Sequence, residues 1–208
     1  MAKRNYTTPV LLRTAVCNEY SDFLVEQLES WDQVIPLITL LETATENDCI
    51  YLTIGGVGGA VNLAAALIEA ITRTPATVVG KLRGTSCASA HSMILLACDY
   101  IDIGVGSRMM IHTYTGGAFG TGAGNIRRDS ESLDFACAEL LERVARGFLT
   151  EEELTHVKEH NHDMYFVGSE IPNRVASLYK YRMANNLVKR GVDYTNAQVC
   201  GVSTEDDK

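Results

Sequence analysis

The sequence lacks several features that would assign it to a membrane, to secretion or to nucleic acids. Its 208 residues contain no stretch of about 18 consecutive apolar residues, so no membrane-spanning helix is predicted. Residues 1–9 are polar and have no apolar signal core. The formal net charge of -8 argues against the clustered basic surface that nucleic acids require. These absences favour a soluble, cytoplasmic protein with no nucleic-acid or membrane partner.

No pair of cysteines has the C-x-x-C spacing, and several cysteines lie within apolar runs. This pattern favours buried free thiols in a reducing compartment over a disulfide framework. The six cysteines are Cys17, Cys49, Cys87, Cys98, Cys137 and Cys200.

Nucleotide-binding motifs are also absent. The glycine run 55–59 does not give G-x-G-x-x-G, and Gly80-Lys81 is followed by Leu82, without the hydroxyl residue of a P-loop. We therefore expect no cofactor and no resident metal.

The composition is that of one ordinary globular domain, with 46% hydrophobic and 21% charged residues. We expect an N-terminal arm at 1–30, partly flexible, a folded domain at 31–200 and a disordered polar tail at 201–208. There are no internal repeats. A chain of this length buries roughly 70% of its unfolded surface and needs no disulfide to fold.

The order of the predicted elements indicates an α/β fold. Strands alternate with helices rich in small and apolar residues, which implies crossover connections and a largely parallel sheet. The predicted strands are 49–54, 77–82, 100–103 and 109–112, and the helices among them are 31–41, 61–71 and 89–98.

The second half of the chain is predicted to be mainly helical. A glycine-rich loop at 115–124 precedes a long helix at 126–148. Thr150 and Glu153 form a capping box that starts a helix ending near residue 160, and a last helix covers about 172–189.

Three residues at the ends of these elements form a candidate catalytic triad. Ser89 begins a predicted helix, where backbone N–H groups and the positive end of the helix dipole lie close by. His112 ends a strand, and the carboxyl ends of parallel strands meet at one crevice. Asp163 lies in a turn, from which a carboxylate can orient an imidazole. Taken singly, each residue more commonly has an ordinary structural role: Ser89 as a helix cap, His112 as a packed or solvated histidine and Asp163 as a turn residue.

Gly58 and Gly59 lie at another strand-to-helix junction. Without side chains they can bring a backbone amide close to a substrate carbonyl, although they also suit a helix entry that binds no ligand.

Four segments together resemble the ClpP family of serine peptidases, in the order and near the spacing of that family. Residues 88–97 resemble its nucleophile helix, especially the Ala-Ser-Ala-Ala-Ser of phage-type members, and 107–112 resemble its Ser-Arg-x-Met-Ile-His. Residues 163–167 are similar to the segment that supplies the triad carboxylate, and 51–61 to the Asn-Ser-Pro-Gly-Gly loop that supplies an oxyanion donor.

The resemblance implies a ClpP/crotonase-like spiral of ββα units with a protruding handle helix at about 125–148. It implies an endopeptidase for unfolded polypeptides, assembled as two stacked heptameric rings and fed by an AAA+ unfoldase. The implied site residues are a Ser89, His112 and Asp163 triad with an oxyanion hole of Gly58, Gly59 and Ala90. The sequence departs from the family at Gly55-Gly56-Val57, before Trp31 and after Ser169.

Three alternatives compete with an active peptidase. One is an inactive ring subunit, and another is a crotonase-type acyl-CoA enzyme with a related fold. The third is a zinc site, because His156 and His160 fit the H-x-x-E-H pattern and His162 lies near them.

Overall fold

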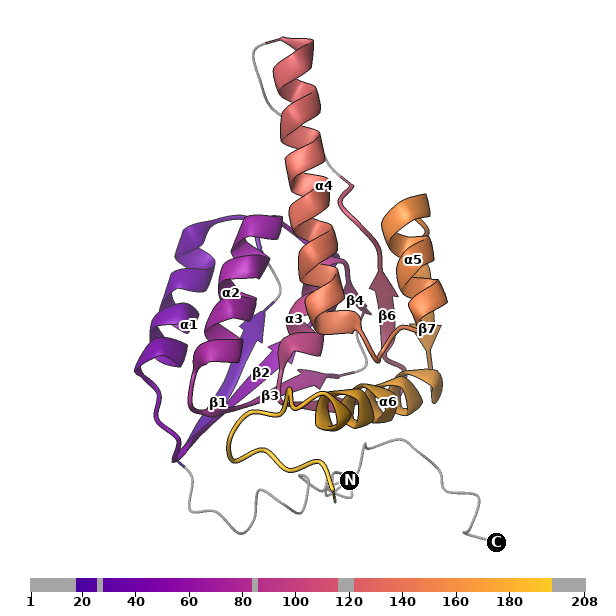
Figure 1. Ribbon diagram of the computed structural model, residues 1–208. Coiled ribbons are helices and arrows are strands. Elements are labelled where there is room, and N and C mark those ends of the chain that lie inside the picture. Colours follow the sequence, from indigo (N-terminus) through magenta and orange to yellow (C-terminus); the bar gives the residue numbers. More distant parts are fainter. Residues whose placement is uncertain (1–17, 26–27, 84–85, 116–121, 196–208) are drawn as a thin grey trace, which may run out of the picture.

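The computed structural model describes residues 18–25, 28–83, 86–115 and 122–195, and within them it confirms the α/β fold. A layer of helices lies against a twisted sheet, one long helix projects from this body, and another helix lies across its far end (Figure 1). No helix within these residues is long and apolar enough to cross a membrane.

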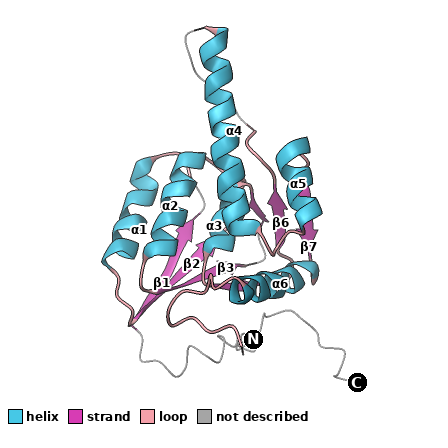
Figure 2. Ribbon diagram, in the orientation of Figure 1, coloured by secondary structure: helices cyan, strands magenta, loops and turns pink. Residues whose placement is uncertain are grey.

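The larger sheet has four strands in the order β1-β2-β3-β5, and all its pairs are parallel. Its strands are β1 (Asn18–Val25), β2 (Asp48–Ile54), β3 (Thr77–Leu82) and β5 (Tyr100–Ile103). The crossover helices α1 (Trp31–Thr43), α2 (Val61–Arg73) and α3 (Ala90–Ala97) connect them (Figure 2). Six of the seven residues of β2 are buried, as expected for a parallel strand covered on both faces.

The strand β1 was not predicted, because its residues were assigned to the N-terminal arm. It pairs with β2 from Asn18 opposite Asp48 to Val25 opposite Ile54, so residues 18–25 belong to the sheet. The polar residues in its sequence NEYSDFLV conceal the apolar run by which strands are recognised. The tail predicted at 201–208, together with Cys17 and Cys200, lies outside the described residues.

A smaller sheet of three strands has the order β4-β6-β7. Its strands are β4 (Ser86–Ala88), β6 (Arg108–Ile111) and β7 (Met164–Val167). The pair β4 and β6 is parallel, and the pair β6 and β7 is antiparallel. Neither β4 nor β7 was predicted, since strands of three or four residues are too short to show a period.

The long helix α4 (Ala123–Ala145) begins and ends three residues before its predicted bounds of 126–148. Its buried residues, Cys137, Leu141, Val144 and Ala145, all lie in its second half. The first half projects beyond the body (Figure 1). The chain leaves α4 through Gly147, where a Cβ would lie 2.4 Å from Cβ of Tyr181, so no larger residue fits there.

Two more helices follow, α5 (Glu151–His160) and α6 (Glu170–Ala184). The predicted capping box of α5 is present, with the Glu153 N–H 3.2 Å from Thr150 Oγ1 and the Thr150 N–H 2.9 Å from a Glu153 oxygen. The same carboxylate makes two 2.7 Å hydrogen bonds with the guanidinium of Arg174 on α6. Glu153 therefore joins the start of α5 to α6.

Replacing Glu153 with Gln should destabilise the protein, and more at neutral than at acidic pH. The hydrogen bonds from Arg174 hold the pKa of this carboxyl below its usual 4.5. A depressed pKa stabilises the fold above the unfolded value, and this contribution is lost as the pH falls through the folded value. We expect a loss of about 1–2 kcal/mol at pH 7. Denaturant unfolding at several pH values should show that the difference in free energy of unfolding between wild type and Glu153→Gln shrinks below pH 4.5. A difference that does not depend on pH would contradict the role of the ionised Glu153 carboxylate.

Candidate active site

Ser89 lies on a sharp turn between β4 and α3 and has strained backbone angles, φ 56° and ψ -126°. A non-glycine residue with positive φ persists only where its surroundings hold it there, and such residues cluster at functional sites. Here the Ser89 N–H donates to the Met110 carbonyl at 2.9 Å, and Ser92 Oγ donates to the same carbonyl at 2.9 Å. The turn is therefore tied to β6. A strained serine between a strand and a helix is the arrangement known as a nucleophile elbow.

His112 and Asp163 are brought together by the antiparallel pairing of β6 with β7. The register pairs Met110 with Tyr165 and Ile111 with Met164, so the next residues, His112 and Asp163, face each other beyond the ends of the two strands. His112 Nδ1 lies 3.6 Å from Asp163 Oδ1. At this distance the two groups do not form a hydrogen bond, and catalytic hydrogen bonds often shorten only when substrate binds. The His112 side chain is 11% exposed and that of Asp163 44%.

The end of α5 positions Asp163. Asn161 caps this helix in the left-handed conformation, with φ 50° and ψ 41°, and its N–H donates to the His156 carbonyl. The Thr113 hydroxyl donates to Asn161 Oδ1 at 2.6 Å, which ties the turn before Asp163 to the residue after His112. Sequence reasoning missed Asn161, although an asparagine after the last helical residue is a recognisable left-handed cap.

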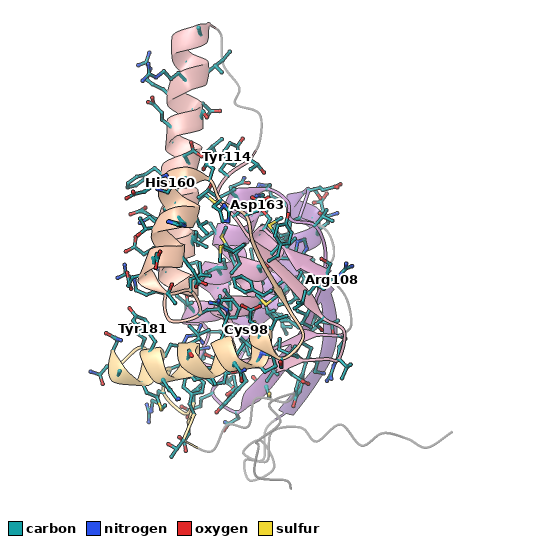
Figure 3. All side chains as sticks on the ribbon, turned by 90° about the vertical axis from the view of Figure 1, so that its right-hand side faces the viewer. Cys98, Arg108, Tyr114, His160, Asp163 and Tyr181 are labelled. Atoms are coloured by element: carbon teal, nitrogen blue, oxygen red, sulfur yellow. The ribbon has the colours of Figure 1, made fainter. Side chains whose placement is uncertain are left out.

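All three candidate triad residues thus lie at the same edge of the small sheet. Ser89 follows β4, His112 follows β6 and Asp163 precedes β7, which runs in the opposite direction. Figure 3 shows Asp163 and Tyr114 at the end of the body from which α4 projects, while Arg108, at the start of β6, lies farther from that end.

The loop at 55–60 lies against the nucleophile turn. Gly58 has φ +118°, and a Cβ there would lie 2.8 Å from Cβ of Ser89, so glycine is required. The Gly58 N–H donates to His91 Nδ1 at 3.0 Å, and this corrects the expectation that Gly58 could be an oxyanion donor. Gly59 and Ala90 remain the candidate donors. Ala90 is the first residue of α3, where the backbone N–H has no acceptor within the helix.

A cavity of about 30 Å³ lies beside Ser89. This volume holds roughly two water molecules. Its lining is mostly small or apolar and includes Ala64 of α2, Met93 of α3, and Cys137 and Leu140 of α4. A small apolar side chain therefore suits it better than a charged one.

Burial disables the neighbouring thiols as rival nucleophiles. Burial raises the pKa of Cys137 to about 11. It also raises the pKa of Cys87 to about 12, although the hydrogen bond from Ser92 has a weaker, lowering effect. Both are protonated at neutral pH, and a thiol reacts only as its thiolate.

The three histidines of the alternative zinc site lie exposed at the end of α5. The ring of His156 is 5.5 Å from that of His160 and 6.4 Å from that of His162, between centroids. Within the described residues no group of three His, Cys, Asp or Glu side chains could hold a metal ion. The arrangement of these described residues therefore does not support the zinc alternative.

Comparison with known proteins places this mixed α/β chain in a family of peptidases. The family model described as Clp protease matches residues 14–170, about three quarters of the chain. The chain therefore belongs to the Clp protease family, as its motifs indicated, and the match disfavours the acyl-CoA alternative. Among curated proteins no significant match was found.

If the Ser89 turn stores strain, Ser89→Gly should be more stable than Ser89→Ala, although both lose the hydroxyl. Relief of a strain of about 1–3 kcal/mol is partly offset by the entropy of glycine in the unfolded chain, which leaves about 1 kcal/mol in favour of Ser89→Gly. Denaturant unfolding measures this difference.

Ser177, exposed within α6, is the matched control. There the order should reverse, with Ser177→Ala about 1 kcal/mol more stable than Ser177→Gly. If the Ala variant is more stable than the Gly variant at both positions, the Ser89 turn carries no strain.

Proposed function

We propose that this Clp family member is a serine endopeptidase with Ser89 as nucleophile, His112 as general base and Asp163 as the carboxylate that orients it. One observation carries the proposal: the strained Ser89 turn and the facing His112 and Asp163 occupy one edge of the β4-β6-β7 sheet. Membership in a peptidase family supports the same reaction.

In this proposal the imidazole of His112 acts first as a general base and then as a general acid. Its Nδ1 faces Asp163, so Nε2 is the atom that accepts the Ser89 hydroxyl proton as Oγ attacks the peptide carbonyl. The same nitrogen then gives the proton to the leaving amine, and water hydrolyses the acyl-enzyme. Asp163 holds the tautomer and stabilises the imidazolium.

The backbone N–H groups of Gly59 and Ala90 would stabilise the oxyanion. Ala90 directly follows the nucleophile, as the oxyanion donor does in other nucleophile turns. The positive N-terminal end of the α3 dipole also favours the negative charge of the oxyanion. Each such donor contributes about 3 kcal/mol to transition-state stabilisation.

The cavity beside Ser89 would receive the substrate side chain before the cleaved bond. Its volume of about 30 Å³ and its lining by Met93, Cys137 and Leu140 favour a small apolar residue. The glycine-rich loop expected to border the substrate lies mostly outside the described residues.

Fluorophosphonate labelling followed by intact mass measurement tests the chemistry. We expect one adduct per subunit on the wild type and none on Ser89→Ala. Loss of His112 or the change Asp163→Asn should slow labelling by about three to four orders of magnitude, because the imidazole is lost or held in the wrong tautomer. Tyr165→Phe is the control: its hydroxyl is 3.4 Å from Asp163 Oδ2, but the change leaves the triad groups in place.

No adduct on wild-type protein that is folded and assembled would refute the peptidase proposal. It would favour the inactive ring subunit, the alternative for which the departure at Gly55-Gly56-Val57 gives a reason.

The proposed assembly is two stacked heptameric rings in the cytoplasm, served by an AAA+ unfoldase. The exposed surface of α4 supports ring stacking, because Phe135, just past the middle of this helix, is 66% exposed and would lie in water in a monomer. The four buried free cysteines within the described residues suit a reducing compartment.

Phe135→Ser should weaken the association of the two rings, because it removes an apolar contact from the proposed interface. Sedimentation velocity should show a shift of mass from the double ring towards single rings. Asp134→Ser, at an exposed neighbouring position on α4, should leave the distribution unchanged. Wild type that sediments only as monomer at micromolar concentration would contradict the assembly.

A further inference from the structure

A buried histidine links the nucleophile helix to the loop beside it. His91 has no exposed surface and is the second residue of α3, two positions after Ser89. Its Nδ1 accepts the Gly58 N–H at 3.0 Å. The neutral ring that accepts at Nδ1 carries its proton on Nε2, so the contact requires the neutral form with one tautomer.

Within the described residues, the other hydrogen bonds of this loop join backbone groups near its two ends, among them one from the Ala88 N–H to the Gly56 carbonyl at 2.9 Å. The Gly55 N–H donates to the Val25 carbonyl at 3.1 Å, and the Gly56 N–H to the Ser86 carbonyl at 2.8 Å. At the other end the Ala60 N–H donates to the Leu28 carbonyl at 2.8 Å. Between these ends, Val57 is 88% exposed and adds little packing. The His91 contact thus holds the middle of the loop.

The middle of the loop needs such a contact because its sequence supplies no stiffness. Four of the five residues at 55–59 are glycine, which can take either sign of φ and allows peptide planes to turn over. With the N–H groups of Gly58 and Ala60 both engaged, the peptide N–H of Gly59 lies between two fixed neighbours.

We infer that His91 is a positioning residue for the oxyanion hole, acting through Gly58 to orient the N–H of Gly59. The inference rests on the proposed function for its catalytic consequence. His91 lies on the same helix as the second donor, Ala90, so the hydrogen bond also joins the two donors into one unit. An oxyanion donor stabilises charge that develops only in the transition state, so its misplacement lowers kcat rather than raising KM.

Two variants separate positioning from packing. His91→Leu keeps a buried side chain but has no acceptor for the Gly58 N–H. His91→Asn is smaller, but its Oδ1 lies near the place of Nδ1 and can accept the same hydrogen bond. A packing role predicts that Asn is the worse replacement, and a positioning role predicts that Leu is.

The measurements are kcat and KM on a fluorogenic peptide with a small apolar residue before the cleaved bond, in the assembled full-length protein. We expect His91→Leu to lower kcat about 10- to 100-fold, with KM within about threefold of wild type, because one donor accounts for about 10²- to 10³-fold. His91→Asn should recover most of that loss. Equal losses in both variants, or kcat unchanged in His91→Leu, would overturn the inference.

A second readout does not depend on activity. Amide hydrogen exchange over residues 55–60, followed by mass spectrometry, should accelerate in His91→Leu and stay near the wild-type rate in His91→Asn. If wild type takes no fluorophosphonate but exchange changes in this way, the peptidase proposal fails and the positioning of the loop by His91 stands. If wild type is labelled but exchange is the same in all three proteins, the positioning inference fails alone.

Discussion

The pairing of β6 with two different partners is the constraint on which the candidate site depends. On one side β6 pairs in parallel with β4, which ends just before Ser89, and on the other it pairs antiparallel with β7, which begins after Asp163. His112 follows β6 itself. Because one neighbour is parallel and the other antiparallel, the end of β4 and the start of β7 meet at the same edge. A one-residue slip in either pairing would turn a site residue to the other face of the sheet.

The rest of the molecule holds this small sheet in place. The helix α3 is buried along its whole length, and the Ser92 hydroxyl in its first turn donates to the carbonyls of Cys87 and Met110. Glu153 and Arg174 bind α5 to α6, and α5 is followed by the Asn161 cap, which accepts a hydrogen bond from the Thr113 hydroxyl beside the site. Strain at Ser89 is tolerated because these contacts leave the turn no relaxed alternative.

Much of the fold could be predicted from the sequence. The helices and the longer strands have apolar patterns of sufficient length, and the Thr150–Glu153 capping box identified the start of α5. The strands β1, β4 and β7 were missed for a physical reason. The first has a polar sequence, and the other two have three and four residues, so pairing with neighbours distant in the chain defines them rather than their own composition.

The sequence by itself determined which chemical groups are available: a serine at a helix start, a histidine after a strand, an aspartate in a turn and glycines that admit close backbone approach. Only the tertiary structure decided how they are used. The register of β6 with β7 brought His112 to Asp163. The packing of α3 against the loop lets the Gly58 N–H donate to His91, so it is not free to bind a substrate. His91 and Gly58 are 33 positions apart, and no local pattern encodes a contact over that distance, because it exists only once α3 has packed against the loop.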